Sequence, residues 1–197
     1  MMYEPIEQSF FDIPGLELAK RLLGQYIVHE QPTGLLVGRI VETEAYQGPD
    51  DRAAHSFGNR RTKRTEIMFG QAGLVYTYQM HTHTLINVVA GPIGTPHAIL
   101  IRAVEPVVGE EQMQKNRGMK LKRVDWTNGP GKLTKALGIT ADYYGHHWSH
   151  TPLFIAKGKK VEHIVTGPRV GIGNSGEAVD YPWRFHEKDN PFVSKYR

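Results

Sequence analysis

The sequence predicts an α+β fold with a strand-rich middle. Three observations predict it: an amphipathic helical pattern near the start, a series of strand-like runs between residues 26 and 104, and short connections between those runs. Short connections favour antiparallel pairing, because parallel strands need a long crossover. The 197 residues show no internal repeat, linker or low-complexity segment, so we expect a single domain covering residues 1–197.

The first helix is predicted over residues 15–23. Its apolar positions recur at helical spacing and form one stripe, made of Leu16, Ala19, Leu22 and Leu23. Asp12 is placed to cap its start, Pro14 suits a first turn, and Gly24 follows as a stop signal.

The remaining elements are assigned by the same rules. Helices are expected over residues 109–117 and 130–137, the second capped by Asn128 or Gly129 and ended by Gly138. Strands are expected over residues 26–29, 35–46, 73–79, 85–89, 98–104, 153–156, 163–165 and 170–172. The Pro- and Trp-containing end of the chain is expected to be irregular.

Composition excludes several classes of protein. The chain has no cysteine, which rules out disulfides, a thiolate nucleophile and cysteine-ligated metal sites. No apolar run is long enough for a membrane span, and the N-terminus lacks the features of a signal peptide, so we expect a cytoplasmic protein with no membrane association. The net charge of +4 is compatible with a polyanionic partner.

The segment from Val41 to His55 is the most informative part of the chain. Glu44 and Tyr46 are two residues apart and therefore point to the same face of the predicted strand. A carboxylate beside an aromatic wall suits a pocket that stacks a planar ring and activates water next to it. Partial burial among apolar neighbours would raise the pKa of Glu44. The alternative is that Glu42 and Glu44 form the solvent face of an edge strand.

Further aromatic residues and polar residues in apolar runs extend this candidate site. His55 with three tyrosines could form a stacking sandwich, although aromatic residues on strands are more often core or surface filler. Arg102 and Asn87 each lie within an apolar strand and need partners if buried. Glu44 is one candidate partner for Arg102, whose head could otherwise reach solvent. The three tyrosines are Tyr46, Tyr76 and Tyr78.

The ten histidines invite a metal-binding interpretation. His81 and His83 would share one face of a strand, and a second cluster contains His146, His147 and His150. Neither cluster has an obvious third carboxylate or cysteine at a familiar ligand spacing, so we expect no metal site.

Basic residues gather in two places, which in proteins are often just solvated faces. The first group directly follows the candidate pocket and could contact phosphates; it contains Arg60, Arg61, Lys63 and Arg64. The second contains Lys115, Arg117, Lys120, Lys122 and Arg123. Lys132 in Asn128-Gly129-Pro130-Gly131-Lys132, at a helix start, is a weak candidate for phosphate binding.

Taken in order, these segments resemble the alkyladenine (3-methyladenine) DNA glycosylase family, whose members include the animal enzymes. The resemblance runs from about residue 16 to residue 194. It is most specific in Glu42-Thr43-Glu44-Ala45-Tyr46 with Ala53-Ala54-His55. It continues through Met68-Phe69, residues 73–78, Asn87, residues 100–106, residues 128–133 and residues 169–173.

The resemblance implies a compact domain with a curved, mostly antiparallel mixed sheet flanked by helices. It also implies flipping of a damaged purine out of duplex DNA. Glu44 matches the glutamate that deprotonates the attacking water, and Arg102 matches an arginine that holds that water and the carboxylate. Tyr46 faces His55 and Tyr78 across the base, and Asn87 matches the asparagine that collides with the amino group of normal guanine.

The resemblance further implies a monofunctional enzyme of base excision repair, since no lysine matches a family nucleophile. Its expected substrates are 3-methyladenine, 7-methylguanine, hypoxanthine and ethenoadenine in double-stranded DNA, and we expect a monomer without cofactor. The chain departs from the family at the tip of one hairpin, where a tyrosine usually wedges into the duplex. Here Met80 or His81 would be the wedge.

Two other functions remain open from the sequence. The altered wedge would suit a catalytically weak module that recognises damage and binds DNA. His81 and His83 would suit a metal-dependent hydrolase.

Overall fold

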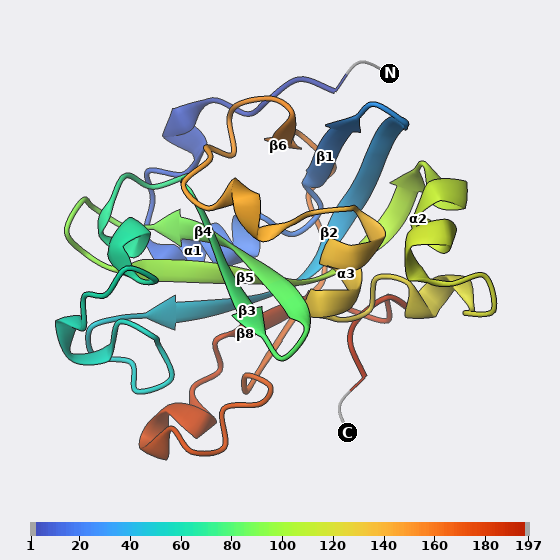
Figure 1. Cartoon of the computed structure of the whole chain (residues 1–197). Coiled ribbons are helices and arrows are strands. Elements are labelled where there is room, and N and C mark those ends of the chain that lie inside the picture. Colours follow the sequence, from blue (N-terminus) through green and yellow to red (C-terminus); the bar gives the residue numbers. More distant parts are fainter. Residues whose placement is uncertain (1–2, 196–197) are drawn as a thin grey trace.

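A computed structural model describes residues 3–195 and consists of one antiparallel sheet with helices packed around it (Figure 1). The strands follow the order β3-β4-β5-β2-β1-β6, and β8 joins β2 on one side and β7 on the other. Their bounds are β1 Tyr26–Gln31, β2 Gly34–Gln47, β3 Val75–Met80, β4 His83–Ala90, β5 His97–Val108, β6 Leu153–Ala156, β7 Ile164–Gly167 and β8 Arg184–Glu187. The expected α+β class is confirmed.

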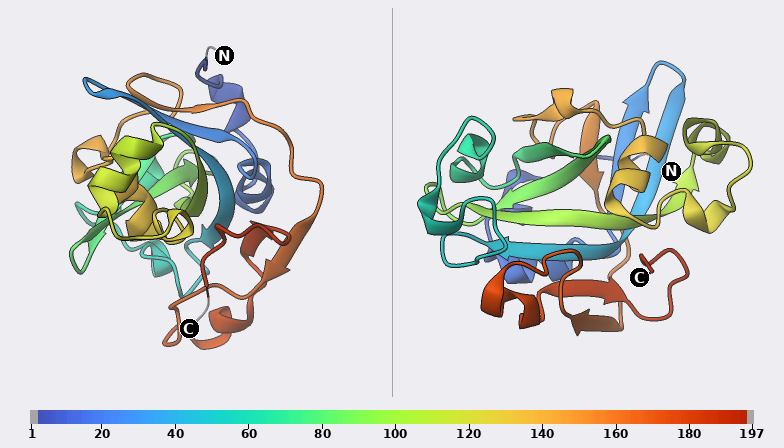
Figure 2. Two further views of the ribbon diagram at one scale, coloured as in Figure 1. Left: turned by 90° about the vertical axis from the view of Figure 1, so that its right-hand side faces the viewer. Right: turned by 60° about the horizontal axis from the view of Figure 1, so that its bottom comes forward.

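The helices are short and lie on both faces of the sheet. Figure 2 (left) shows α1 on one side of the curved strand β2 and the α2–α3 pair on the other. The α-helices are α1 Gly15–Arg21, α2 Glu110–Arg117 and α3 Pro130–Ala136. The 3-10 helices are η1 Gln8–Phe10, η2 Phe57–Asn59, η3 Glu66–Phe69, η4 Arg123–Asp125, η5 Ala141–Tyr143 and η6 Gly176–Asp180. None of the helices within residues 3–195 is both long and apolar enough to cross a membrane.

Strand β2 is the centre of the sheet. One side of it pairs with β5 along most of its length, while its other side pairs first with β1 and then, at residues 42–44, with β8 (Figure 2, right). Glu42 and Glu44 have no exposed surface. The alternative that they form the solvent face of an edge strand is therefore wrong. Strand β8 pairs with β2 at residues 42–44, so β2 is not an edge strand there.

The pairing of β2 with β5 is irregular beside these carboxylates. Glu42 pairs with Ala103 and Thr43 with Ile101, so Arg102 stands between the paired positions. Such irregularities bend a strand and change the direction of a side chain. The irregularity therefore sits where Arg102 meets the carboxylates of β2.

Two predictions of local structure are wrong, one about a helix cap and one about a strand. Asp12 does not cap α1, because the N-cap position is Pro14, which makes no side-chain capping bond. Residues 170–172 are not a strand but part of a loop, since Gly171 has a φ of +76°, a left-handed conformation that a strand excludes. The sequence Val170-Gly171-Ile172 has the alternation of a strand, but these residues are not part of the sheet.

The prediction of an irregular C-terminal end also needs correction, because it contains β8. This strand is polar at Arg184 and His186, so apolar alternation did not reveal it. Arg184 is nevertheless 8% exposed, because its guanidinium donates to the buried Glu42. The strand expected over residues 153–156 is present with the same bounds, and the other predicted strands and helices are present with one or both ends shifted.

Candidate functional site

A cavity of about 430 Å³ opens on the face of the sheet formed by β2 to β5. The loop after β2, the start of α3 and the loop at residues 170–175 complete its rim. Seven of the predicted site residues line it, namely Tyr46, His55, Tyr76, Tyr78, Met80, Asn87 and Arg102. Residues from Tyr46 to Ser175 in the sequence thus meet in one pocket.

Glu44 lies directly behind this lining and is fully buried. Its Oε1 accepts the backbone N–H of Val170 at 2.7 Å and lies 3.3 Å from Arg102 Nη1. Its Oε2 accepts the Tyr46 hydroxyl at 2.8 Å. Burial raises the pKa of Glu44 above its ordinary value, although Arg102, the Val170 N–H and the Tyr46 hydroxyl oppose the shift. A carboxyl group with a raised pKa is suited to accept a proton at neutral pH.

Arg102 joins two carboxylates on the same face of β2. Its Nε donates to Glu42 Oε1 at 2.9 Å, and its Nη1 approaches Glu44. The expected pairing of Arg102 with Glu44 is therefore present, and the alternative in which its head reaches solvent is wrong, because Arg102 is only 6% exposed. A guanidinium fixed between two anions holds positive charge at the cavity wall.

Three aromatic rings form a cluster on one wall of the cavity. The His55 and Tyr78 ring centroids are 4.6 Å apart in an edge-to-face arrangement, and Tyr76 lies 5.6 Å from Tyr78. His55 Nδ1 is hydrogen-bonded to the Tyr76 hydroxyl at 2.7 Å. Burial and the charge of Arg64 lower the pKa of His55 to about 4, so the imidazole is neutral near pH 7. Burial also raises the pKa of Tyr78 to about 12.

The remaining predicted side chains complete the pocket. Asn87 is buried, and its Nδ2 donates to the Tyr76 carbonyl at 2.9 Å, which fixes the amide against the cavity. Tyr46 reaches the cavity from β2, with its hydroxyl held by Glu44. The cavity thus combines stacking surfaces, an amide and a cation, and a buried carboxylate lies directly behind its lining.

Comparison with known proteins agrees with this geometry. A family model described as methylpurine-DNA glycosylase matches residues 9–191. The chain belongs to this family.

Close relatives cover nearly the whole chain. A protein of Bacillus licheniformis is 59% identical over 193 residues, which is 98% of each chain, and one of Bacillus velezensis is 57% identical over 98% of this chain and 97% of its own. A protein of Bacillus subtilis is 57% identical over 97% of each chain. All three are named provisionally as 3-methyladenine DNA glycosylases. Membership in the family makes this chain a methylpurine-type DNA glycosylase, a hydrolase of N-glycosyl bonds that binds DNA and acts in its repair.

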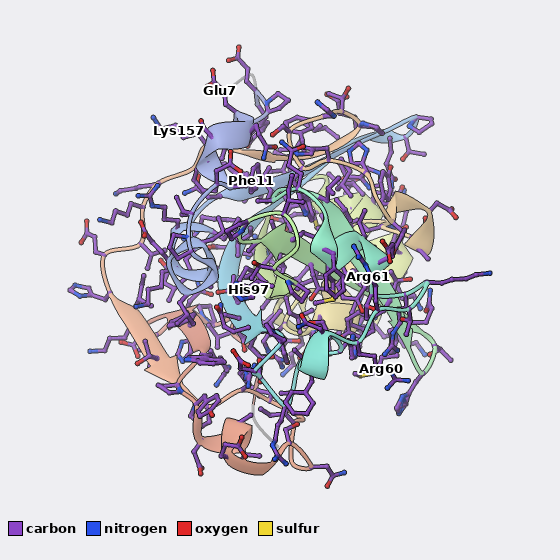
Figure 3. All side chains as sticks on the ribbon, turned by 90° about the vertical axis from the view of Figure 1, so that its left-hand side faces the viewer. Glu7, Phe11, Arg60, Arg61, His97 and Lys157 are labelled. Atoms are coloured by element: carbon purple, nitrogen blue, oxygen red, sulfur yellow. The ribbon has the colours of Figure 1, made fainter. Side chains whose placement is uncertain are left out.

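The basic residues of the glycosylase differ in how they are held. Arg60 and Arg61 lie on the outer segment between β2 and β3 (Figure 3). Arg61 is paired with Glu66 at 3.0 Å and stacks over Phe69 at 4.4 Å from the ring centroid. Arg64 is exposed and acts electrostatically on His55, so its charge reaches the pocket.

The remaining predicted phosphate ligand and His146 are hydrogen-bonded within the protein, and His81 lies in the turn between β3 and β4, so it does not share a strand face with His83. Lys132, in the first turn of α3, donates to Oδ1 of Asn128, just before the helix, at 2.7 Å. His146 Nε2 donates to the carbonyls of His150 and Leu153. Within residues 3–195, no group of three or more His, Cys, Asp or Glu side chains is placed to hold a metal ion.

A buried ion pair that sequence analysis missed supports both walls of the pocket. Arg169 makes two hydrogen bonds to Asp51, one of them 2.8 Å long, and both side chains are inaccessible to solvent. The Arg169 guanidinium also stacks on the Tyr46 ring at 4.6 Å and donates to the Ala45 carbonyl. Asp51 Oδ1 accepts the N–H of Ala53, which lines the cavity. The only hint of this ion pair in the sequence was Asp51, a charged residue within the segment from Val41 to His55.

Asp51→Asn is expected to destabilise the glycosylase by about 3–5 kcal/mol, because it leaves the Arg169 charge buried without its anion. Urea unfolding measures this loss. Glu17→Gln breaks the half-exposed Glu17–Arg21 pair and is the matched control, with an expected change below about 1 kcal/mol. Equal effects of the two substitutions would contradict the structural importance of the buried pair.

Proposed function

We propose that this glycosylase is monofunctional and removes alkylated or deaminated purines from double-stranded DNA with a water that Glu44 activates. The observation that carries the proposal is a fully buried carboxylate, paired with Arg102, directly behind a cavity walled by aromatic rings. Candidate substrates are 3-methyladenine, 7-methylguanine, hypoxanthine and ethenoadenine. The enzyme would act as a monomer.

The cavity is suited to a base that has left the helix. An atom inside the duplex is out of reach of a buried carboxylate, so the target nucleotide must turn out of the stack. Tyr46 would stack on one face of the base, and His55 with Tyr78 would hold the other. Stacking of a base on an aromatic side chain is worth about 1–3 kcal/mol. Asn87 would then exclude the exocyclic amino group of normal guanine.

The charges of the pocket favour a damaged purine. Alkylation at N3 or N7 makes the base cationic, which weakens its glycosidic bond and strengthens its attraction to the tyrosine rings. His55 is neutral near pH 7 and so does not repel such a base. The selection among purines would therefore combine stacking, charge and ease of unpairing.

Glu44 would act on the sugar side of the base. It takes a proton from water as the water oxygen forms a bond to C1′, and the glycosidic electron pair leaves with the purine. Each carboxylate oxygen has two lone pairs, so Glu44 can bind water in addition to Val170 and Tyr46. Its negative charge also stabilises an oxocarbenium-like transition state. Among the described residues no lysine lines the cavity, which supports hydrolysis without strand cleavage.

Single-turnover release of the base from duplex oligonucleotides tests the proposal. Each oligonucleotide carries one of the four lesions, and the assay contains a chelator so that a metal-dependent hydrolase would be inactive. Release of one or more of these bases, leaving an intact abasic strand, is the expected result. Tight binding of every lesion without any release would instead support the damage-recognition module.

We also propose that Met80, rather than His81, fills the gap left by the flipped base. Met80 is 47% exposed and lines the cavity at the end of β3, whereas His81 occupies the turn with a φ of +54°. Apolar side chains of this kind separate base steps in bent or opened duplexes.

Met80→Ala is expected to lower the rate of base release from a paired lesion by about tenfold, since unstacking a base step costs a few kcal/mol. The same lesion in single-stranded DNA, which needs no plug, would lose less. His81→Ala is the matched control on the same hairpin. A larger loss in the control than in Met80→Ala would assign the wedge to His81.

A further inference from the structure

A second carboxylate, Glu42, is buried behind the proposed catalytic carboxylate and receives four hydrogen bonds. Its Oε1 accepts from Arg102 Nε at 2.9 Å, Arg184 Nε at 2.7 Å and Ser194 Oγ at 2.8 Å, and its Oε2 accepts the Ser194 N–H at 2.7 Å. Buried ionised groups persist only when they are paired and hydrogen-bonded. Glu42 does not line the cavity, so these bonds point to a role that acts through its partners.

The geometry of Arg102 depends on this carboxylate. Arg102 stands at the irregular step between β2 and β5, where the ladder does not fix its direction. Its Nε is bound by Glu42, which leaves Nη1 directed at Glu44 Oε1, 3.3 Å away. Because the guanidinium is planar, fixing Nε fixes the placement of Nη1 as well.

Ser194 also contributes to the placement of Arg102. Ser194 contacts Glu42 through its N–H and hydroxyl, and its hydroxyl also accepts from Arg102 Nη2 at 3.3 Å. Arg184 Nη2 donates to the Ser194 carbonyl at 3.3 Å. A residue near the C-terminus therefore touches both members of the Glu42–Arg102 pair.

From these contacts we infer that Glu42 is a positioning residue, which with Ser194 aims Arg102 at Glu44 and prevents Arg102 from fully neutralising it. The inference rests on the proposed role of Glu44 as the base. Two roles are thereby divided between carboxylates two residues apart on one strand.

The charges around the pair have opposite effects on the two carboxyl groups. Burial would raise the pKa of Glu42, but Arg102, Arg184 and the Ser194 N–H together lower it, so Glu42 stays ionised. The groups facing Glu44 are Arg102, Glu42, Tyr46, Tyr78 and the Val170 N–H. Among these Glu42 carries a like charge, which adds to the raised pKa of Glu44. Environments that separate two carboxyl pKa values assign them different tasks.

Glu42→Gln tests the inference through the pH dependence of single-turnover base release. The substrate is duplex DNA containing 7-methylguanine, whose base already carries a positive charge and needs no further proton to leave. Removing the like charge is expected to move the acid limb of the profile to lower pH by about one unit. Misplacement of Arg102 is expected to lower the plateau rate about 10- to 100-fold. Affinity for the DNA should change by less than about threefold, because Glu42 does not line the cavity.

The matched control is Glu105→Gln. Arg39 also bridges two carboxylates, Glu105 and Glu187, so this substitution breaks a similar cluster away from Glu44. It should leave the position of the acid limb unchanged. A folded Glu42→Gln protein whose acid limb stays in place would overturn the inference. This holds even if its rate is lower at every pH, because a smaller fraction of active enzyme lowers the rate without moving the acid limb.

Ser194→Ala decides the question if Glu42→Gln does not fold, since it removes one hydroxyl without changing a charge. The expected result is a plateau rate lowered about three- to tenfold at unchanged DNA affinity. A rate equal to that of the unmutated enzyme would overturn the inference. Absence of base release by the unmutated enzyme, or full release by Glu44→Gln, would refute the proposed function instead. Failure of the inference about Glu42 and failure of the proposed function can therefore be told apart.

Discussion

Glu44→Gln is expected to lower the single-turnover rate of base release by about 10²- to 10⁴-fold, the range typical of a removed general base. The substitution keeps the size of the side chain and the acceptor for the Val170 N–H, so affinity for damaged DNA should stay within about tenfold. Rate and affinity are measured on the same oligonucleotide. Full activity of the variant would contradict the assignment of Glu44 as the base.

The pH dependence of the unmutated enzyme provides a second test of Glu44. Base catalysis requires the ionised form, and burial raises the pKa of this group. The rate should therefore fall as the pH drops through a value above the ordinary pKa of a glutamate. An acid limb at or below the ordinary value would contradict a desolvated base.

The raised pKa of Glu44 also predicts the stability of the Glu44→Gln variant. A group whose pKa is raised by folding stabilises the protein below its unfolded pKa and loses that contribution as the pH rises through the folded value. At neutral pH the ionised Glu44 is thus a cost to the fold, and Glu44→Gln should unfold at the same or a higher urea concentration. A lower midpoint would show that the hydrogen bonds of the anion outweigh its burial.

Arg102→Lys is expected to lower base release by about 10²- to 10³-fold, comparable to the loss of one donor that stabilises a transition state. A lysine ammonium is a single point charge and cannot reproduce the planar bridge from Glu42 to Glu44. The variant keeps the positive charge, so the loss would measure geometry rather than charge. Single-turnover kinetics at saturating enzyme give the rate of the chemical step.

Arg102→Ala extends this test to charge. It leaves two buried carboxyl groups side by side without their shared cation, which raises the pKa of at least one of them and moves the acid limb to higher pH. The direction is opposite to that expected for Glu42→Gln. Breaking the buried pair should also destabilise the fold by about 3–5 kcal/mol, so the assay is run well below the unfolding temperature. Unchanged kinetics in both Arg102 variants would refute its role.

The amino-acid sequence by itself determined the fold class and most of the strands. Strands β1 to β5 have alternating or continuous apolar patterns that local periodicity detects, and their short connections dictate antiparallel pairing. The Glu44-Ala45-Tyr46 segment and its companions also carried the family resemblance, because their residue types and order are fixed along the chain. Tyr46, His55, Tyr78, Asn87 and Arg102 were all candidates before the pocket was visible.

The tertiary structure alone decided which groups surround Glu44. The partners of Glu42 include Arg184 and Ser194, which lie 142 and 152 residues further along the chain, and no local pattern encodes such contacts. In the polar strand β8, Arg184 donates to this buried carboxylate, and in the loop at residue 170 the N–H of Val170 donates to Glu44. Periodicity shows on which face a side chain lies, whereas burial, ionisation and the direction of a guanidinium depend on what packs against that face.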